Sequence, residues 1–450
     1  MNYTTQDVSA ATGGVLSGDG SVVLQGGEID TRRDVQGKVF FALQGEQTDG
    51  HQFIERAIEM GCAAVVVSKE VTTSVPVITV ENTRRALFQL AEHVRSQIEA
   101  KTTIAITGSV GKTTTKDLLA KLLGKGTTAS PASFNNDLGI PLTILDAVGS
   151  RNLVVEVGAN ACGEIEPLAR LVAPDIAIIT SIQKAHLEGF GSNDTILNEK
   201  IKLFKALDSD GIAIVPEDIP VDGFNLQCDL VTLGESKHAD IRIRSACDEN
   251  GFTRLDVGEG FVTLNILGKH NAMNAACAIV AAKYAYARQG INVSLHSLLQ
   301  QISSETGPVG RLSKEDICGV RVIDDSYNAN PASMYAAIET LVSMSSSRKV
   351  AILGDMLELG KQCDVEHRRL GGYLSNQRID QIILVGSAMA SAVRVLPTAV
   401  YEENADDATM LRIAKSLRDG DLVLLKGSRG MQLERIVEYI RDRYAKVSSP

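Results

Sequence analysis

The chain has 450 residues, of which 44% are hydrophobic and 22% charged. This length corresponds to about three domains, and the lack of Pro-rich, Ser-rich or strongly charged tracts excludes a disordered chain. A formal net charge of −10, with Lys and Arg scattered along the sequence, argues against a nucleic-acid surface and favours small substrates.

The hydropathy pattern and the cysteines favour a cytoplasmic protein. The first residues lack a positive region followed by an apolar stretch, and no apolar run reaches the ~18 residues of a membrane span. Seven cysteines lie far apart between Cys62 and Cys363, without a Cys-x-x-Cys pair, so we expect neither a disulfide framework nor a zinc site. We therefore expect a cytoplasmic monomer that spans no membrane and binds no nucleic acid.

Residues 1–100 are predicted to form a small α/β domain, because short apolar runs rich in Val alternate with helical patterns. The expected strands cover 39–43, 63–67 and 75–80, and the expected helices cover 53–60 and 83–98.

Residues 101–310 are predicted to form a central domain on a mostly parallel sheet. Short apolar runs alternate here with helical segments, which is typical of strands buried on both faces. Alternating stretches interrupted by an Asn-Gly and a Gly-Glu-Gly turn predict antiparallel hairpins attached to the edge of that sheet. The expected strands cover 102–107, 153–157, 176–180 and 212–215, and the hairpins lie within 240–267.

Residues 311–450 are predicted to form a third domain with an open, doubly wound, Rossmann-like sheet, since each strand is followed by a helical pattern. The domain has no Gly-x-Gly-x-x-Gly fingerprint, so we do not expect dinucleotide binding there. The predicted fold class is therefore α/β in three domains. The expected strands of the third domain cover 320–324, 350–353, 382–385 and 422–425.

Residues 107–114, with the sequence TGSVGKTT, lie between a predicted strand and a helix with leucines at helical spacing. Glycines let the backbone approach phosphate oxygens, the helix N-terminus and Lys112 supply positive charge, and the Thr113 hydroxyl can hold Mg²⁺. Two residues separate the glycines, whereas the common phosphate-loop pattern has four. The alternative is a Gly-rich turn that binds nothing; we predict ATP binding.

Polar residues that follow the central strands are candidates for metal binding, because ligands gather at the carboxyl ends of parallel strands. Glu156 ends an apolar run and either binds a cation or is a buried, hydrogen-bonded carboxylate. His186 follows another strand, where a lone histidine is usually structural. By composition alone, Lys200 is a solvated helix lysine.

Three further segments concentrate polar side chains next to helices. Residues 268–274 can hydrogen-bond a base or ribose, or cap the next helix. Residues 324–331 place two carboxylates ahead of a helix near Pro331, and offer a nucleotide or metal contact or only a turn with Asn330 as N-cap. Residues 426–429 (KGSR) after a strand are typical of an anion site for carboxylate or phosphate.

Together these segments resemble the Mur ligases, the ATP-dependent amide-forming enzymes of peptidoglycan precursor synthesis. The resemblance covers nearly the whole chain and includes shared motifs at 107–114, 135–143, 185–188 and 268–271. Within the family, three segments look most like the members that add D-alanyl-D-alanine to UDP-N-acetylmuramoyl-tripeptide. These segments are 49–51, 323–334 and 353–360.

The resemblance implies a role for each domain and for individual residues. The first domain would hold the UDP end of the substrate and the central domain ATP. Lys200 falls on the lysine that is carbamylated in relatives and helps to bind a second Mg²⁺, and Lys112, His186 and Lys200 would be catalytic. The implied metal ligands are Thr113, Glu156, His186 and Lys200. The implied nucleotide contacts are Gly108, Ser109, Gly111, Lys112, Thr113, Thr114, Asn271, Asn274, Arg311 and Asp325. The implied substrate contacts are Asp30, Thr31, Arg32, Asn135, Asn136, Tyr327, Asn328, Lys426, Ser428 and Arg429.

The implied reaction passes through an acyl phosphate, because an amine cannot displace hydroxide from a carboxylate. The nearest rival is another ligase of the superfamily, adding a diamino acid or extending folate with glutamate. The chain lacks the Asp-Asn-Pro-Arg motif expected of diamino-acid-adding enzymes and has GDMLE at 354–358 instead. A second rival is a nucleotide-dependent switch without amide chemistry.

Overall fold

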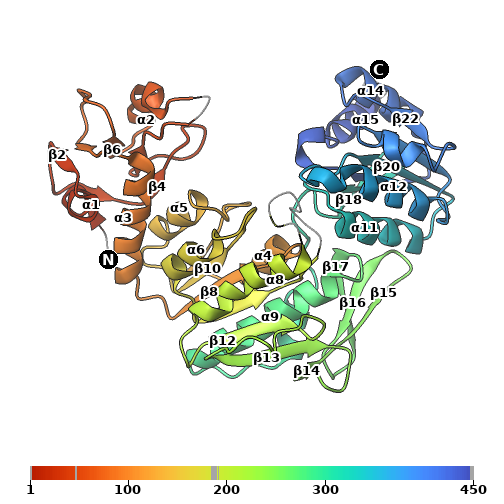
Figure 1. The fold of residues 1–450 in the computed structure, drawn as a ribbon, viewed down its shortest axis with the longest axis horizontal. Coiled ribbons are helices and arrows are strands. Elements are labelled where there is room, and N and C mark those ends of the chain that lie inside the picture. The colour runs from red at the N-terminus through yellow and green to blue at the C-terminus, as the bar shows by residue number, and fades with distance from the viewer. Residues whose placement is uncertain (1–2, 46–47, 184–189, 191, 446–450) are drawn as a thin grey trace.

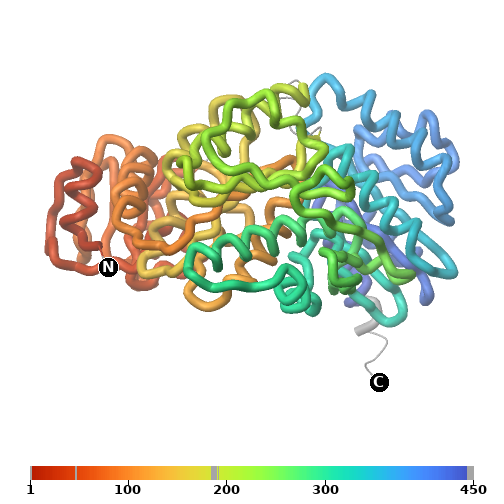
Figure 2. Tube along the Cα trace, turned by 90° about the horizontal axis from the view of Figure 1, so that it is seen from below, coloured from red at the N-terminus to blue at the C-terminus, as the bar shows by residue number. Residues whose placement is uncertain are grey.

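The structure is a computed structural model that describes residues 3–45, 48–183, 190 and 192–445. Three α/β parts follow one another along the chain, the first at the left, the second below and the third at the upper right of Figure 1. Seen from below in Figure 2, the parts succeed one another along the long axis of the molecule. None of the described helices is long and apolar enough to cross a membrane.

The first part is built on a five-stranded sheet of order β2-β7-β6-β5-β4, with a two-stranded β1-β3 ladder beside it. Its strands are β1 Tyr3–Thr4, β2 Val15–Ser17, β3 Val23–Leu24, β4 Gly27–Glu28, β5 Val39–Phe41, β6 Ala64–Val67 and β7 Val77–Thr79. Its helices are α1 Thr5–Thr12, η1 Gly50–Phe53, α2 Ile54–Glu59 and α3 Thr83–Gln97. Asn82 caps α3 by accepting a hydrogen bond from the amide of Arg85, as expected of an Asn before an amphipathic helix.

The second part is a seven-stranded parallel sheet of order β14-β13-β12-β11-β8-β10-β9. Its strands are β8 Thr102–Thr107, β9 Thr127–Ala129, β10 Asn152–Glu156, β11 Ile176–Ile179, β12 Ile212–Pro216, β13 Asp229–Gly234 and β14 Ile241–Arg242. The helices are α4 Lys112–Leu123, α5 Gly139–Leu145, α6 Ile165–Val172, α8 Asn193–Lys200, η2 Ile201–Ala206, α9 Asn271–Arg288 and α10 Leu295–Gln301. Strand β8 lies between β10 and β11, so the strand order reverses at β8. The loop after β8 therefore lies at a topological switch point, where ligands bind in sheets of this kind.

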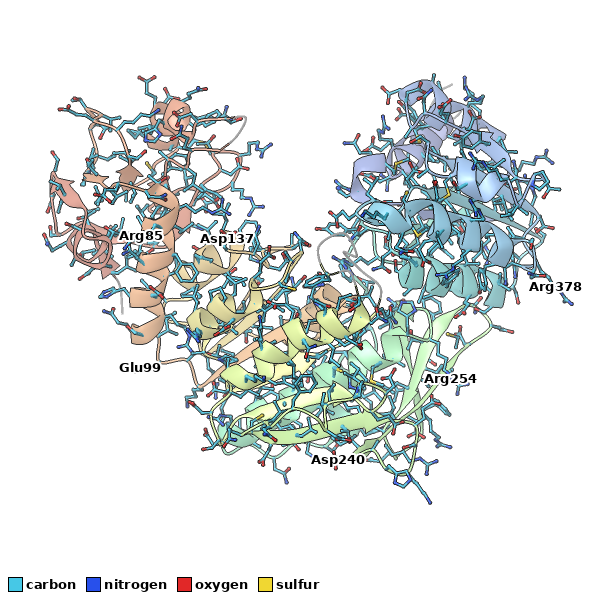
Figure 3. All side chains as sticks on the ribbon, viewed as in Figure 1. Arg85, Glu99, Asp137, Asp240, Arg254 and Arg378 are labelled. Atoms are coloured by element: carbon cyan, nitrogen blue, oxygen red, sulfur yellow. The ribbon has the colours of Figure 1, made fainter. Side chains whose placement is uncertain are left out.

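The antiparallel strands of the central part form a separate sheet, so the prediction that they attach to the edge of the parallel sheet is wrong. They are β15 Arg244–Cys247, β16 Phe252–Asp256 and β17 Phe261–Leu267, in the order β15-β16-β17. Leu255, Leu264 and Ile266 are buried in one cluster with the Ala-rich helix α9. Packing against α9 therefore holds this sheet, and Arg254, labelled in Figure 3, comes from its middle strand.

The third part is a six-stranded sheet of order β18-β19-β23-β20-β21-β22, parallel except for the edge strand β18. Its strands are β18 Ser313–Ile317, β19 Val320–Asp325, β20 Arg348–Gly354, β21 Gln381–Val385, β22 Val400–Glu402 and β23 Asp421–Lys426. Its helices are α11 Pro331–Ser343, η3 Gly360–Gln362, α12 Cys363–Leu374, α13 Ala390–Val393, α14 Asp407–Ser416, η4 Arg429–Met431 and α15 Arg435–Ala445. Pro331 occupies the first turn of α11, as predicted. Asn330 forms a capping box with Ser333, which agrees with the N-cap alternative given for this segment.

The first two parts share a hydrophobic core, whereas the third has its own. One buried cluster joins Leu87 and Leu90 of α3 to Leu142 of α5 and continues to the central sheet. Two other clusters cover the two faces of the third sheet, and of the central part only Leu267 belongs to one of them among the described buried residues. The predicted α/β fold class is confirmed. The strands β1 to β4, β9, β13, β18 and β22 were not predicted. All of them except the six-residue β13 have only two to five residues, which carry little periodicity.

Candidate active site

The loop between β8 and α4 has the backbone of a phosphate loop. Gly108 and Gly111 have φ of +151° and +90°, a region open mainly to glycine. The amides of Ser109 and Val110 donate to the carbonyl and hydroxyl oxygens of Ser181, at 2.9 and 3.0 Å. The first amides of α4 have no intrahelical acceptor, so the N-terminus of this helix offers donors that suit an anion beside the loop.

Lys112 begins α4 and folds back over the loop. Its Nζ donates a hydrogen bond of 2.8 Å to the carbonyl oxygen of Gly108. Burial lowers the pKa of Lys112, the charge of Arg311 acts in the same direction, and Glu156 opposes both. An anion beside the loop would offset the cost of burying this ammonium group, because a nearby negative charge stabilises its charged form. The surroundings of Lys112 therefore suit a bound phosphate.

Glu156 ends β10 and is 1% exposed. Its Oε2 accepts a hydrogen bond of 2.8 Å from the hydroxyl of Thr113, and its Oε1 accepts one of 2.9 Å from the amide of Asn135. Among the described residues, each oxygen thus has one neutral donor, and the carboxylate is held in place by these two hydrogen bonds rather than by an ion pair. This arrangement fits a ligand for a hard cation beside a phosphate loop.

Lys200 is buried, so the composition-based reading of a solvated helix lysine is wrong. It ends α8, is 3% exposed and lines the same pocket as Lys112. Burial and the charge of Lys112 lower its pKa to about 7, and Glu199 opposes this shift. The predicted ligand His186 lies outside the described residues. Among the residues that are described, no three His, Cys, Asp or Glu side chains are placed to hold a metal.

Helix α9 presents two amides to the phosphate loop. Asn271 Nδ2 donates to the carbonyl oxygen of Leu267 at 2.7 Å, and Asn274 Nδ2 donates to Asn271 Oδ1 at 2.7 Å. A side chain at Gly111 would collide with Asn274, so the loop and this amide are in direct contact. Both asparagines therefore line the pocket beside the loop, in addition to lying in the first turn of the helix.

The third part brings its own charged groups to this place. Asp325 and Lys426 end the neighbouring strands β19 and β23, and their side chains form an ion pair of 2.6 Å. Burial raises the pKa of Asp325, and the ammonium group of Lys426 opposes that shift. The guanidinium of Arg311 lies 4.4 Å from the ring of Tyr327. The Tyr327 hydroxyl reaches Ser133 of the central part at 2.5 Å.

A pocket of about 320 Å³ joins these groups from the second and third parts. Most predicted nucleotide contacts line it. Thr113 does not line it, but its hydroxyl donates a hydrogen bond to the pocket residue Glu156. Predicted residues lining the pocket are Gly108, Ser109, Gly111, Lys112, Thr114, Asn135, Asn136, Glu156, Lys200, Asn271, Asn274, Arg311, Asp325, Tyr327, Asn328 and Lys426.

Five predicted substrate residues do not line this pocket. Asp30, Thr31 and Arg32 lie in the first part, where Asp30 accepts hydrogen bonds from Arg32. Ser428 is buried and its hydroxyl accepts a hydrogen bond from the backbone amide of Leu357, and Arg429 forms an ion pair with Glu434.

The pocket lining also includes residues that were not predicted as site residues, among them Ser133, Glu164 and Gln183. Ser133 and Gln183 each lie two residues before a segment singled out in the sequence, 135–143 and 185–188, and this proximity was the available signal. Glu164 accepts a hydrogen bond from the Asn160 amide and had no such signal.

The fold and the site define a three-part α/β protein with a phosphate loop facing a carboxy-terminal Rossmann-like part. Comparison with known proteins gives the family. The Mur ligase family catalytic-domain model matches residues 25–95, the Mur ligase middle-domain model matches 106–282, and the Mur ligase glutamate ligase domain model matches 310–429. The chain belongs to the Mur ligase family, as the sequence motifs predicted.

Relatives of known name match over nearly the whole chain. A UDP-N-acetylmuramoyl-tripeptide–D-alanyl-D-alanine ligase of Bacillus subtilis is 35% identical and covers 92% of this chain and 93% of the relative. A crystal structure of MurF from Acinetobacter baumannii has a TM-score of 0.85 at 30% identity and covers 98% of this chain and 99% of that one. A crystal structure of MurF ligase from Thermotoga maritima in complex with ADP has a TM-score of 0.78 at 26% identity, over 94% and 99%.

Proposed function

We propose that this chain is an ATP-dependent ligase that joins D-alanyl-D-alanine to UDP-N-acetylmuramoyl-tripeptide, giving the pentapeptide precursor of peptidoglycan, ADP and phosphate. The observation that carries the proposal is the pocket in which the phosphate loop faces Arg311, Asp325 and Lys426 of the third part. The full-length similarity to ligases of this name supports the choice of substrates.

The chemistry begins with the terminal carboxylate of the tripeptide, which must exchange an oxygen for a better leaving group. Attack of this carboxylate on the γ-phosphorus of ATP forms an acyl phosphate and releases ADP. The amine of D-alanyl-D-alanine then attacks the acyl carbon, and phosphate leaves. Lys112, Arg311 and the first amides of α4 stabilise the phosphoryl oxygens, because they are fixed positive groups where negative charge develops.

We propose that Mg²⁺ ions, two in number, share this pocket with ATP. Thr113, Glu156 and His186 would serve as metal ligands, and a carbamylated Lys200 would help to hold the second ion. Bound Mg²⁺ would supply charge neutralisation at the phosphoryl oxygens. A carbamate forms on an unprotonated amine, and the lowered pKa of Lys200, about 7, supports this modification at neutral pH.

The remaining assignments of the domains follow from the family. We propose limits at 1–100, 101–310 and 311–450, with the first domain binding the UDP end of the substrate through Asp30, Thr31 and Arg32. Arg33 of this part lies 4.1 Å from the ring of Phe134, next to the pocket residue Asn135. We place the enzyme in the cytoplasm, in keeping with its seven free cysteines, and propose that it is a monomer.

Phosphate release in the presence of ATP, Mg²⁺ and UDP-N-acetylmuramoyl-tripeptide tests the proposal. We expect release to require both the peptide and D-alanyl-D-alanine, and the pentapeptide to be seen by mass. Release with diaminopimelate, lysine or glutamate as the amine would move the enzyme elsewhere in the superfamily. Release that needs neither peptide nor amine would instead favour a nucleotide-dependent switch.

A further inference from the structure

Lys116, one turn after Lys112 on α4, is a buried lysine to which the reaction assigns no role. It is 3% exposed, and its Nζ donates to the carbonyl oxygens of Ser130 at 2.7 Å and of Ala132 at 3.3 Å. Its remaining partner is the carboxylate of Asp117 at 2.9 Å. A buried ammonium group with backbone acceptors is costly unless its hydrogen bonds are made, so Lys116 holds these carbonyls firmly.

The carbonyls that Lys116 binds flank an unusual turn. Ala132 has φ of +44°, which is uncommon for a residue with a side chain, and the amide of Phe134 closes the turn on the carbonyl of Pro131 at 3.0 Å. Such a backbone persists only where surrounding contacts fix it. The two hydrogen bonds from Lys116 are contacts of this kind.

The residues that follow this turn touch all three parts of the protein. Ser133 accepts a hydrogen bond from the hydroxyl of Tyr327 in the third part, and the ring of Phe134 lies under the guanidinium of Arg33 in the first part. Asn135 donates to Glu156, and its carbonyl accepts the amide of Gly158 at 2.7 Å. We call residues 130–136 the junction segment.

We propose that Lys116 is a positioning residue that fixes the junction segment, so that Asn135 orients Glu156 beside the phosphate loop while Ser133 receives Tyr327 from the third part. Lys116 does not touch the pocket itself and acts through these neighbours. The inference rests on the proposed use of the pocket for ATP, because a fixed position of Glu156 increases the rate of phosphoryl transfer.

The first test compares Lys116→Met, which keeps the length and removes the donor, with Lys116→Arg, which keeps both charge and donors. Misplacing catalytic groups slightly costs roughly 10- to 100-fold, so we expect kcat of Lys116→Met to fall by that factor. We expect KM for the UDP-peptide to stay near its original value and Lys116→Arg to recover most of the loss. Lys121→Met is the matched control, since Lys121 lies on the same helix with its side chain 65% exposed.

The second test measures the junction segment directly. The chain contains no Trp, so Phe134→Trp introduces a single fluorescent reporter next to the turn. We expect acrylamide to quench this tryptophan more strongly when Lys116→Met is added, at temperatures well below the melting transition. Lys121→Met should leave the quenching unchanged.

Lost turnover together with raised quenching supports the positioning role. Unchanged kcat in Lys116→Met, or lost kcat with unchanged quenching, would overturn it. If Lys116→Met does not fold at the assay temperature, the same two measurements on Lys116→Gln decide the matter. A wild-type protein without peptide-dependent phosphate release would refute the proposed function, whereas the quenching result bears on Lys116 alone.

Discussion

Thr113 Oγ1 donates a hydrogen bond of 2.8 Å to Oε2 of Glu156, so the first turn of α4 is joined directly to the end of the neighbouring strand β10. Hydroxyl and carboxylate are both oxygen ligands of the kind that Mg²⁺ prefers. The pair therefore links the phosphate loop to the proposed metal site before any ligand binds.

Thr113→Val removes this hydroxyl while keeping the shape of the side chain. We expect kcat to fall by about 10²-fold and half-maximal activity to need more Mg²⁺, because one charge-stabilising contact is lost. A titration of phosphate release with Mg²⁺ measures both effects. Thr115→Val is the matched control, since the Thr115 hydroxyl is buried without a partner among the described residues. Equal behaviour of the two variants would argue against a metal role for Thr113.

Lys112→Met should abolish turnover with the fold intact, because the fixed positive charge at the phosphoryl oxygens disappears. Losses of roughly 10²- to 10³-fold are typical when one such group is removed. Phosphate release and the thermal unfolding curve together test this expectation. Wild-type activity in Lys112→Met would remove the phosphate-loop assignment, and Lys121→Met again serves as the control.

Lys200→Ala should be inactive, and small carboxylic acids such as acetate should restore part of its activity by standing in for the lost carbamate. Added bicarbonate should raise the activity of wild-type protein prepared without carbon dioxide. Mixing with ¹³C-bicarbonate should also give a carbamate resonance that is absent from Lys200→Ala. If neither acid nor bicarbonate changes either protein, the carbamate assignment loses its support.

Tyr327→Phe should weaken the contact between the second and third parts and leave the ring under Arg311 in place. A single hydrogen bond contributes about 1 kcal/mol, so we expect kcat to fall about fivefold. Adding Ser133→Ala should cost nothing further, because both substitutions remove the same bond. Full additivity of the two losses in kcat would show that the Tyr327–Ser133 hydrogen bond does not contribute to turnover.

Glu28 gives a pH dependence of stability in the first part. It is 5% exposed, and burial raises its pKa, with the amides of Ile29 and Asp30 opposing. The folded state thus keeps a proton that the unfolded state has released, so stability falls as pH rises from the ordinary glutamate pKa through the raised one.

The test compares urea midpoints of wild type and Glu28→Gln between pH 4 and pH 7. We expect the variant to lose less stability over this interval, because its amide does not titrate. Glu55→Gln, at an exposed position, should follow the wild-type curve. Parallel curves for wild type and Glu28→Gln would contradict the prediction.

The sequence by itself determined the fold class, the family and the long elements. Strand 102–107 was predicted with its observed bounds, and helix α3 to within one residue, because these segments carry strong periodicity or capping signals. The cap of α11 by Asn330 was one of two alternatives that the sequence offered for this segment, since a cap depends only on neighbouring residues. Such features depend on interactions between residues that are close in the sequence, so the sequence alone predicts them.

Only the tertiary structure decided how distant residues share one pocket. The burial of Lys200 and Lys116, the register that pairs Asp325 with Lys426, and the contact of Tyr327 with Ser133 depend on packing between segments far apart in sequence. The antiparallel strands β15 to β17 likewise pack on α9 rather than extend the main sheet. Burial and electrostatic surroundings are properties of the packed chain, so no pattern of neighbouring residues could have fixed them.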